Sequence, residues 1–185
     1  TNAGKMSKSK GEFLTVSLLE EKGYDPLVYR FFCMQSHYRK NLVFSWENLD
    51  NARVAYNKLV ARIASLKIND GDAIDEKKFA IGKQKFTDAL DNDLNTSLAV
   101  TALYDALKLD TNDKTKLALI EDFERVLSLG LIDAAKKAVE KETSEKQDEN
   151  TGVDPELLAY INAKIEERKN AKKAKDFAEA DRIRD

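Results

Sequence analysis

Lysine and serine side chains are concentrated close to the start of the chain, at Lys5, Ser7, Lys8 and Ser9, in a segment bounded by two glycines. Ammonium groups supply positive charge and hydroxyls supply hydrogen-bond donors, and both suit a phosphate group. Glycines at the two ends allow such a loop to open and close. The segment therefore predicts a mobile loop that binds phosphate.

Two other interpretations of this loop stay open when its residues are taken alone. A P-loop has Ser or Thr after its lysine, whereas Met6 follows Lys5 here and no strand precedes the segment. The other interpretation is a basic chain end without fixed structure. The residues that follow the loop have to decide between these possibilities.

The rest of the chain has the composition of a helical protein, with 42% hydrophobic and 35% charged residues and only two prolines among 185 residues. The clearest pattern places apolar residues three and four apart between Trp46 and Leu66, which predicts a long amphipathic helix. Further helices are expected over 16–22, 26–36, 75–90 and 96–107, between 113 and Gly130, and from Pro155 onward. Because the loops between them are short, we expect an all-α fold with an antiparallel helical bundle.

Several residues between or within these helices have a definite expected place. The segment 37–44 breaks the helical pattern and is expected to be extended. In the helix that ends at Gly130, Val126 is expected to face the core with its apolar neighbours. Asp91 and Asp93 lie at a helix junction, where we expect them to cap helix ends and not to form an acid/base pair. Asn95 or Thr96 is expected to cap the helix that follows.

Residues 140–153 are charged and polar without a large apolar side chain, and cannot bury enough surface to offset the entropy lost on ordering. We expect a flexible linker there, between the bundle at 45–139 and a truncated helical hairpin at 154–185. The chain starts with Thr1, and the helical pattern is still running at its last residue. We therefore expect the chain to be part of a longer protein.

The net charge of -2 gives no global field for nucleic acid, so any RNA contact has to come from local basic faces. Cys33 is the single cysteine, which excludes an internal disulfide and fits a reducing compartment. No apolar run has the length of a bilayer-spanning helix, and no signal-peptide pattern is present. We expect a cytoplasmic monomer.

The order of several motifs resembles one family. The five residues 5–9 match the signature loop of class I aminoacyl-tRNA synthetases, Lys-Met-Ser-Lys-Ser. The blocks after it are similar, in the same order, to the stem-contact region, helical bundle and C-terminal helix of cysteinyl-tRNA synthetases. These blocks are 11–15, 23–32, 36–39, 93–96, 130–133 and 171–185. The chain thus resembles the C-terminal part of that family, from the signature loop through the bundle.

This resemblance implies a stem-contact segment at 1–44 and a bundle of the anticodon-binding, DALR-like type. It implies ligation of L-cysteine to tRNA(Cys) through cysteinyl-adenylate, with ATP and Mg²⁺. Lys8 would be the principal contact to the ATP phosphates and Lys5 the supporting one, while Ser7 and Ser9 shape the ATP-binding loop. The family's Zn²⁺ belongs to the catalytic domain and not to this chain, which alone is expected to be inactive.

Two groups of basic residues are candidates for tRNA contact. Arg39 and Lys40 follow the helix 26–36, where the family's stem-contact fold approaches tRNA. The second group lies in the last helices and consists of Lys169, Lys172, Lys173 and Lys175. A solvated helical face is the alternative for this second group.

Cys33 and His37 are four residues apart, the spacing of two metal ligands on one helix face, but two ligands do not make a site. We expect no metal site here, a buried Cys33, and a His37 that is hydrogen-bonded or adjacent to RNA. The alternative function is a free-standing helical tRNA-binding module or a non-catalytic synthetase paralogue. The lysine-rich loop argues against it, since a binding module needs no adenylate chemistry.

Overall fold

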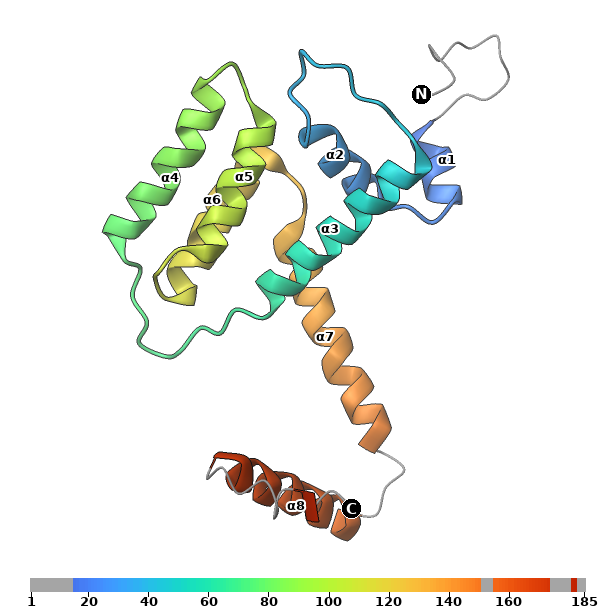
Figure 1. The fold of residues 1–185 in the computed structure, drawn as a ribbon, viewed down its shortest axis with the longest axis vertical. Helices are drawn as coiled ribbons and strands as arrows, with labels where there is room; N and C mark the ends of the chain where they lie inside the picture. The colour runs from blue at the N-terminus through green and yellow to red at the C-terminus, as the bar shows by residue number, and fades with distance from the viewer. Residues whose placement is uncertain (1–14, 151–154, 174–180, 183–185) are drawn as a thin grey trace. The chain divides into compact units, whose positions relative to one another are not determined.

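The computed structural model describes residues 15–150, 155–173 and 181–182 (Figure 1). Eight helices are present in these ranges. They are α1 (Val16–Glu21), α2 (Pro26–Met34), α3 (Trp46–Ala64), α4 (Glu76–Asp91), α5 (Thr96–Lys108), α6 (Asp113–Leu127), α7 (Leu131–Asn150) and α8 (Pro155–Lys173). The described residues contain no strand, so the expected all-α fold is confirmed.

The chain divides into two compact units, residues 1–139 and 140–185. The first unit joins the segment before residue 45 to the helices after it, because α2 packs on α3. The sequence predicts a boundary at 44/45, whereas the structure keeps both sides of that position in one unit. The second unit holds the end of α7 and helix α8.

Side-chain caps fix where the helices of the first unit begin. Thr15, Asp25 and Ser45 each accept a hydrogen bond from a backbone N–H in the first turn of α1, α2 and α3. Pro26 follows its cap at the first helical position, where its missing N–H costs nothing. These local signals explain why the starts of the helices agree with the sequence prediction.

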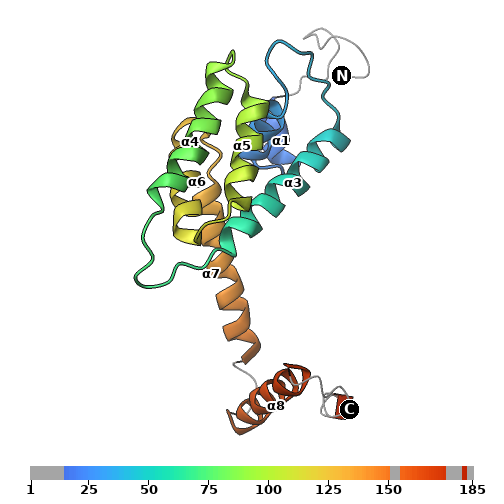
Figure 2. The same ribbon diagram turned by 60° about the vertical axis from the view of Figure 1, so that its left-hand side comes forward.

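Helices α4, α5 and α6 lie side by side, as both views show (Figures 1 and 2). Four residues, 92–95, separate α4 from α5 and four more, 109–112, separate α5 from α6, which makes consecutive helices antiparallel. Gly82 allows α4 to approach α6 closely, because a Cβ at this position would lie 2.7 Å from Leu119 Cδ1. The three helices are part of the antiparallel bundle that the sequence predicts over 45–139.

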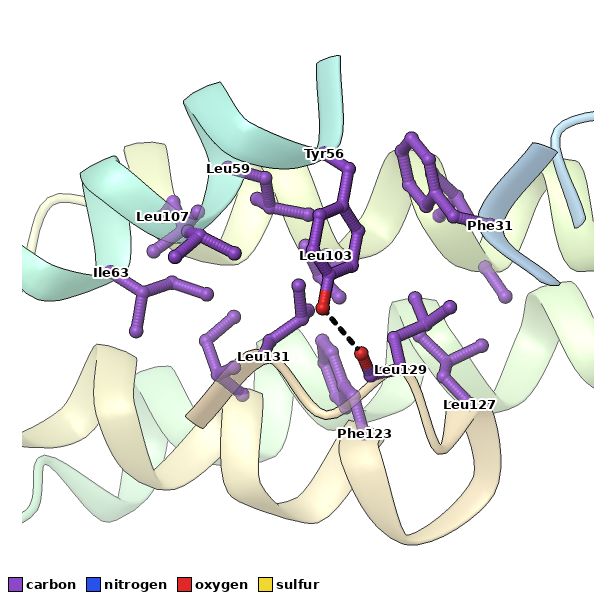
Figure 3. Close-up of a cluster of buried hydrophobic side chains, with 14 of the residues drawn as sticks. Phe31, Tyr56, Leu59, Ile63, Leu103, Leu107, Phe123, Leu127, Leu129 and Leu131 are labelled. Atoms are coloured by element: carbon purple, nitrogen blue, oxygen red, sulfur yellow. Dashed lines mark hydrogen bonds between the residues drawn. The ribbon is translucent and has the colours of Figure 1, made fainter. Parts of the chain in front are cut away.

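One core connects α1 through α6 and the start of α7, and Figure 3 shows a part of it. Phe31, Leu103 and Phe123 are completely buried in it. Tyr56 is the polar member, and its hydroxyl donates to the Leu129 carbonyl oxygen at 2.8 Å. This hydrogen bond joins α3 to the turn before α7. The Phe31 ring of α2 meets the Tyr56 ring at a centroid distance of 5.9 Å, so α2 packs into the same core.

The structure differs from the sequence prediction at residues 140–150, which continue helix α7 where a flexible linker is expected. Glu, Lys and Gln dominate this stretch, and their high helix propensity favours helix without tertiary packing. The Ser144 hydroxyl donates to the Glu140 carbonyl oxygen at 3.1 Å within that helix. Residues 151–153 of the expected linker lie outside the described residues.

Two smaller expectations also change. Val126 is half exposed, because the buried face of α6 runs through Leu119, Phe123 and Leu127 instead. The segment 37–44, expected to be extended, begins with a turn. The Lys40 backbone N–H donates to the His37 carbonyl oxygen at 2.8 Å, and only the residues after Lys40 are free of turns. No helix in the described ranges combines the length and apolar character that a membrane span requires.

The buried Tyr56 should make the protein less stable to unfolding at high pH. Burial first, and then the negative charges of Asp25 and Glu124, raise the pKa of Tyr56 from 10.0 to about 12. The folded state therefore resists ionisation that the unfolded chain permits, so the contribution is complete below pH 10 and is lost between pH 10 and about 12. Urea unfolding at several pH values should show a steeper fall for wild type than for Tyr56→Phe. Parallel curves would contradict this prediction.

Candidate nucleic-acid interface

The predicted phosphate-binding loop lies outside the described residues, so Lys5, Ser7, Lys8 and Ser9 have no described geometry. The same holds for Lys175. Lys173 is described only as the last residue of α8. The site that the structure does define is the turn after α2, which carries Arg39 and Lys40.

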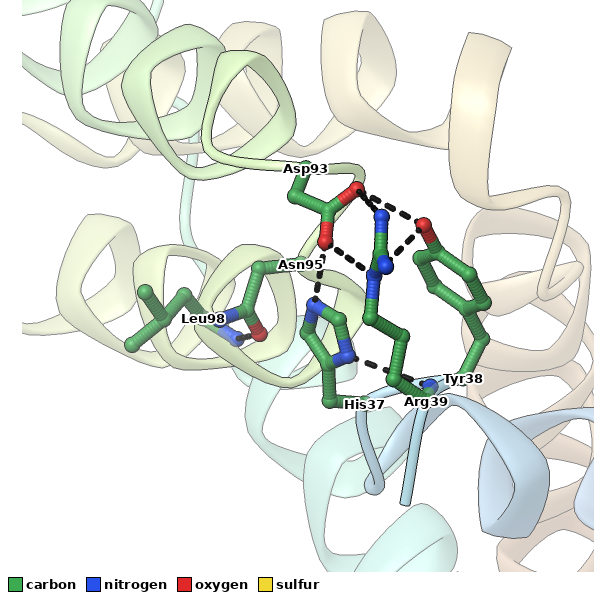
Figure 4. A network of polar contacts seen from close by, with 6 residues as sticks. All are labelled: His37, Tyr38, Arg39, Asp93, Asn95 and Leu98. Atoms are coloured by element: carbon green, nitrogen blue, oxygen red, sulfur yellow. Dashed lines mark hydrogen bonds and ion pairs between the residues drawn. The ribbon is translucent and has the colours of Figure 1, made fainter.

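This turn begins with His37 and is held by local contacts (Figure 4). The Arg39 backbone N–H donates to His37 Nδ1 at 3.2 Å, and the imidazole stacks on the Tyr38 ring with centroids 4.9 Å apart. The Arg39 guanidinium carbon lies 5.4 Å from the centroid of the Tyr38 ring. His37 is thus hydrogen-bonded, as expected, and its ring forms part of the turn.

Asp93 binds this turn from the junction between α4 and α5 (Figure 4). Arg39 Nε donates to Asp93 Oδ2 at 2.6 Å, and Arg39 Nη2 donates to Oδ1 at 3.0 Å, which makes the pair bidentate. The Tyr38 hydroxyl donates to Oδ1 at 2.7 Å. His37 Nε2 lies 3.7 Å from Oδ2. Three consecutive side chains therefore converge on one carboxylate.

The backbone at the junction adopts an unusual conformation to present this carboxylate. Asp93 and Leu94 have φ angles of 57° and 51°, in the left-handed region. That region costs about 1–2 kcal/mol for a residue with a side chain, and Asp tolerates it better than Leu. The Asn95 N–H donates to the Ala89 carbonyl oxygen at 3.1 Å, and Asn95 then caps α5. The sequence prediction that Asp93 caps a helix is wrong, whereas the prediction that Asn95 or Thr96 caps α5 is confirmed for Asn95.

The hydrogen bonds among Tyr38, Arg39 and Asp93 shift the pKa values of these side chains. The Arg39 guanidinium first, and then the Tyr38 hydroxyl, lower the pKa of Asp93. The same contact raises the pKa of Tyr38 and of Arg39. The carboxylate therefore stays ionised, and the pair stays intact, down to a lower pH than an ordinary aspartate would allow. Below that range protonation of Asp93 removes the pair, and the stability it adds is lost as the pH falls.

Lys40 differs from Arg39 in its surroundings. It is exposed at the end of the turn, and within the described part of the chain its ammonium group has no hydrogen bond or ion pair. Its charge is therefore available to an external anion. In the second unit, Lys169 pairs with Glu166 at 2.8 Å, whereas Lys172 is an exposed residue of α8.

Cys33 lies at the end of α2 and is half-buried. Burial raises the pKa of its thiol, which disfavours the thiolate that metal ions bind. The residues that the structure describes hold no group of three or more His, Cys, Asp or Glu side chains suited to a metal ion. Cys33 and His37 thus provide no donor set for zinc in the described structure.

Sequence reasoning found both sides of the network but not their contact. The blocks 36–39 and 93–96 stand out by resemblance, yet Arg39 and Asp93 are 54 residues apart. Nothing in the spacing within either block predicts that they meet. The only available signal was the occurrence of both blocks in one family.

Comparisons with known proteins agree with the resemblance. No family model matches the chain. The cysteine--tRNA ligase of Novosphingobium aromaticivorans is 36% identical over 186 residues, which is 99% of this chain and 36% of the relative. Cysteine--tRNA ligase 1 of Burkholderia lata is 35% identical over 98% of the chain and 34% of the relative. The enzyme of Borrelia turicatae is 34% identical over 98% of the chain and 38% of the relative.

The helical fold and these relatives define the class as the helical, C-terminal part of class I aminoacyl-tRNA synthetases. Within that class the chain belongs to the cysteinyl-tRNA synthetase family. It spans about a third of the length of the relatives that it matches.

Proposed function

We propose that this chain is the tRNA-binding part of a cysteine--tRNA ligase, which joins L-cysteine to tRNA(Cys) with ATP through cysteinyl-adenylate. The similarity over 98–99% of the chain to ligases of that name carries the proposal. The chain alone would be inactive, because about two thirds of the length of these relatives has no counterpart in it.

The residues at the start of the chain would act in the first step. Lys8 is the proposed principal contact to the phosphates of ATP and Lys5 the supporting one, with Ser7 and Ser9 shaping the loop. Positive charge at this place would stabilise the charge that builds up on the phosphates as adenylate forms. Mg²⁺ would accompany ATP, and Zn²⁺ would belong to the catalytic part of the longer protein.

The turn 37–40 is the proposed contact to tRNA in the first unit. Lys40 offers an exposed ammonium group without a partner among the described residues. Phosphate contacts by such groups dominate affinity for nucleic acid. The candidate contacts in the second unit are Lys169, Lys172, Lys173 and Lys175. The Lys169–Glu166 pair favours a weaker role for Lys169, since its charge is already balanced.

The alternative is a free-standing tRNA-binding module or a paralogue without catalysis. It would use the same turn and the same basic helix. The lysine-rich loop favours the ligase, because a module that only binds tRNA has no use for phosphate chemistry.

The test is the binding of a tRNA(Cys) transcript to the 185-residue chain at several salt concentrations. We expect a dissociation constant of about 10⁻⁶ to 10⁻⁴ M that weakens with salt. The slope of the logarithm of the binding constant against the logarithm of the salt concentration (the salt slope) should become smaller by about one in Lys40→Gln, because one phosphate contact is lost. Lys85→Gln on α4, where the lysine already pairs with Asp105 at 3.8 Å, serves as the matched control. Absence of saturable binding would contradict the proposal.

A further inference from the structure

We infer that Asp93 is a positioning residue for the tRNA-binding turn, and that Arg39 acts by holding this turn in place instead of binding a phosphate. This inference rests on the proposed function and refines the role of one of its candidate residues. The pairing of Arg39 and Asp93 is the observation that carries it.

The first argument is the state of the Arg39 charge. Both oxygens of Asp93 accept hydrogen bonds from the guanidinium, at 2.6 and 3.0 Å, and Arg39 Nε also donates to the Tyr38 hydroxyl at 3.1 Å. The pair is electrically neutral as a unit. A phosphate contact gains affinity by adding unbalanced positive charge, and this pair adds none.

The second argument is the weakness of the local structure around the turn. One backbone hydrogen bond closes it, and residues 41–45 that follow have no regular secondary structure. Within the described residues, each side-chain hydrogen bond and ion pair from this turn to the bundle ends on Asp93. Removing the carboxylate would therefore release Tyr38, Arg39 and the adjacent Lys40 together.

The third argument is the placement of Asp93 itself. The chain adopts the left-handed region at Asp93 and Leu94 in succession, and strained backbone of this kind concentrates at functional positions. The conformation directs the Asp93 side chain toward the turn, as Figure 4 shows. Leu94 is 64% exposed, so burial of its side chain does not explain the conformation.

The experiment compares Asp93→Asn, Arg39→Gln and Arg39→Lys in the tRNA(Cys) binding assay with the 185-residue chain. Asn tolerates the left-handed conformation, so Asp93→Asn removes the charge and leaves the backbone in place. We expect all three variants to weaken binding by a similar factor, about threefold to tenfold. Arg39→Lys should fail as Arg39→Gln does, because lysine lacks the planar fork that holds a carboxylate. The salt slope should stay that of the wild type in each case, because Lys40 still meets its phosphate in the complex and only the entropy cost of ordering the turn rises.

A direct phosphate contact by Arg39 gives the opposite pattern. Arg39→Lys would then retain most of the affinity, Arg39→Gln would reduce the salt slope by about one, and Asp93→Asn would tighten binding by freeing the guanidinium. Unchanged binding of Asp93→Asn would likewise overturn the inference. Asp105→Asn is the matched control, since it removes a carboxylate from a similarly exposed ion pair between α4 and α5.

A readout without RNA separates this inference from the proposed function. In amide NMR spectra, Asp93→Asn should shift the resonances of Tyr38, Arg39 and Lys40, and Asp105→Asn should leave them in place. Wild type that does not bind tRNA(Cys) would defeat the proposed function, and the spectra would then decide the positioning role. Unchanged turn resonances in Asp93→Asn would overturn that role whatever the binding result.

Discussion

Lys8→Ala should slow cysteine-dependent ATP–pyrophosphate exchange by about 10²–10³-fold in a protein that joins this chain to the remaining part of the ligase. The physical reason is that Lys8, in its proposed role, would supply positive charge where negative charge accumulates on the phosphates during adenylate formation. Affinity for tRNA(Cys) should change little, since the proposed contact of Lys8 is to ATP and not to tRNA. Exchange rates and tRNA binding are measured on the same preparation.

Lys10→Ala is the matched control for this prediction. Lys10 is a lysine of the same segment but lies just outside the five residues of the signature loop. Its removal should change exchange by a small factor only. Unchanged exchange in Lys8→Ala, or an equal loss in Lys10→Ala, would contradict the assignment of Lys8.

Phe123→Ala should have the largest effect on stability. The ring is completely buried and stacks on Phe86 with centroids 4.1 Å apart and planes at 7°. Removing a buried phenyl ring loses its transfer free energy and leaves a cavity, together about 3–5 kcal/mol. The free energy of unfolding by urea measures this loss, followed by circular dichroism of the helices.

Val126→Ala on the same helix is the control for the core prediction. Its side chain is 52% exposed, so the loss should stay within about 0.5 kcal/mol. Similar losses for both variants would contradict the packing described for α6. A small loss for Phe123→Ala alone would mean that the core can close around the missing ring.

The sequence predicts the helices well wherever a cap and an apolar period coincide. Ser45 before α3 and Asp75 before α4 accept the first-turn hydrogen bonds that their residue types favour. Local chemistry is sufficient at such places, because the cap and the helix it starts are neighbours in sequence. The buried face of α3 follows for the same reason.

Two parts of the fold required information that local patterns lack. The continuation of α7 past residue 140 depends on helix propensity without burial, whereas the polar composition of this stretch predicts a linker. The wrong place for Val126 has a different cause. An apolar residue next to the buried face of a helix fits the three-and-four spacing of that face. Whether its side chain is buried depends on which neighbouring helices pack against it.

The candidate site divides in the same way. The resemblance predicts a tRNA contact for Arg39, and the structure shows that its guanidinium donates two hydrogen bonds to Asp93. A contact over 54 residues depends on how the helices pack, and the left-handed backbone at Asp93 has no sequence signal other than the tolerance of Asp for it. Lys40 could be chosen from sequence, but its unpaired state could not.

The most direct test of the proposed ligase function is the charging of tRNA by the longer protein that contains this chain. Charging is measured with each amino acid in turn. We expect cysteine, and no other amino acid, to become esterified to tRNA(Cys), with loss of charging in Lys8→Ala. Charging with a different amino acid would contradict the proposed cysteine--tRNA ligase activity. Tight tRNA(Cys) binding without any charging would favour the non-catalytic alternative instead.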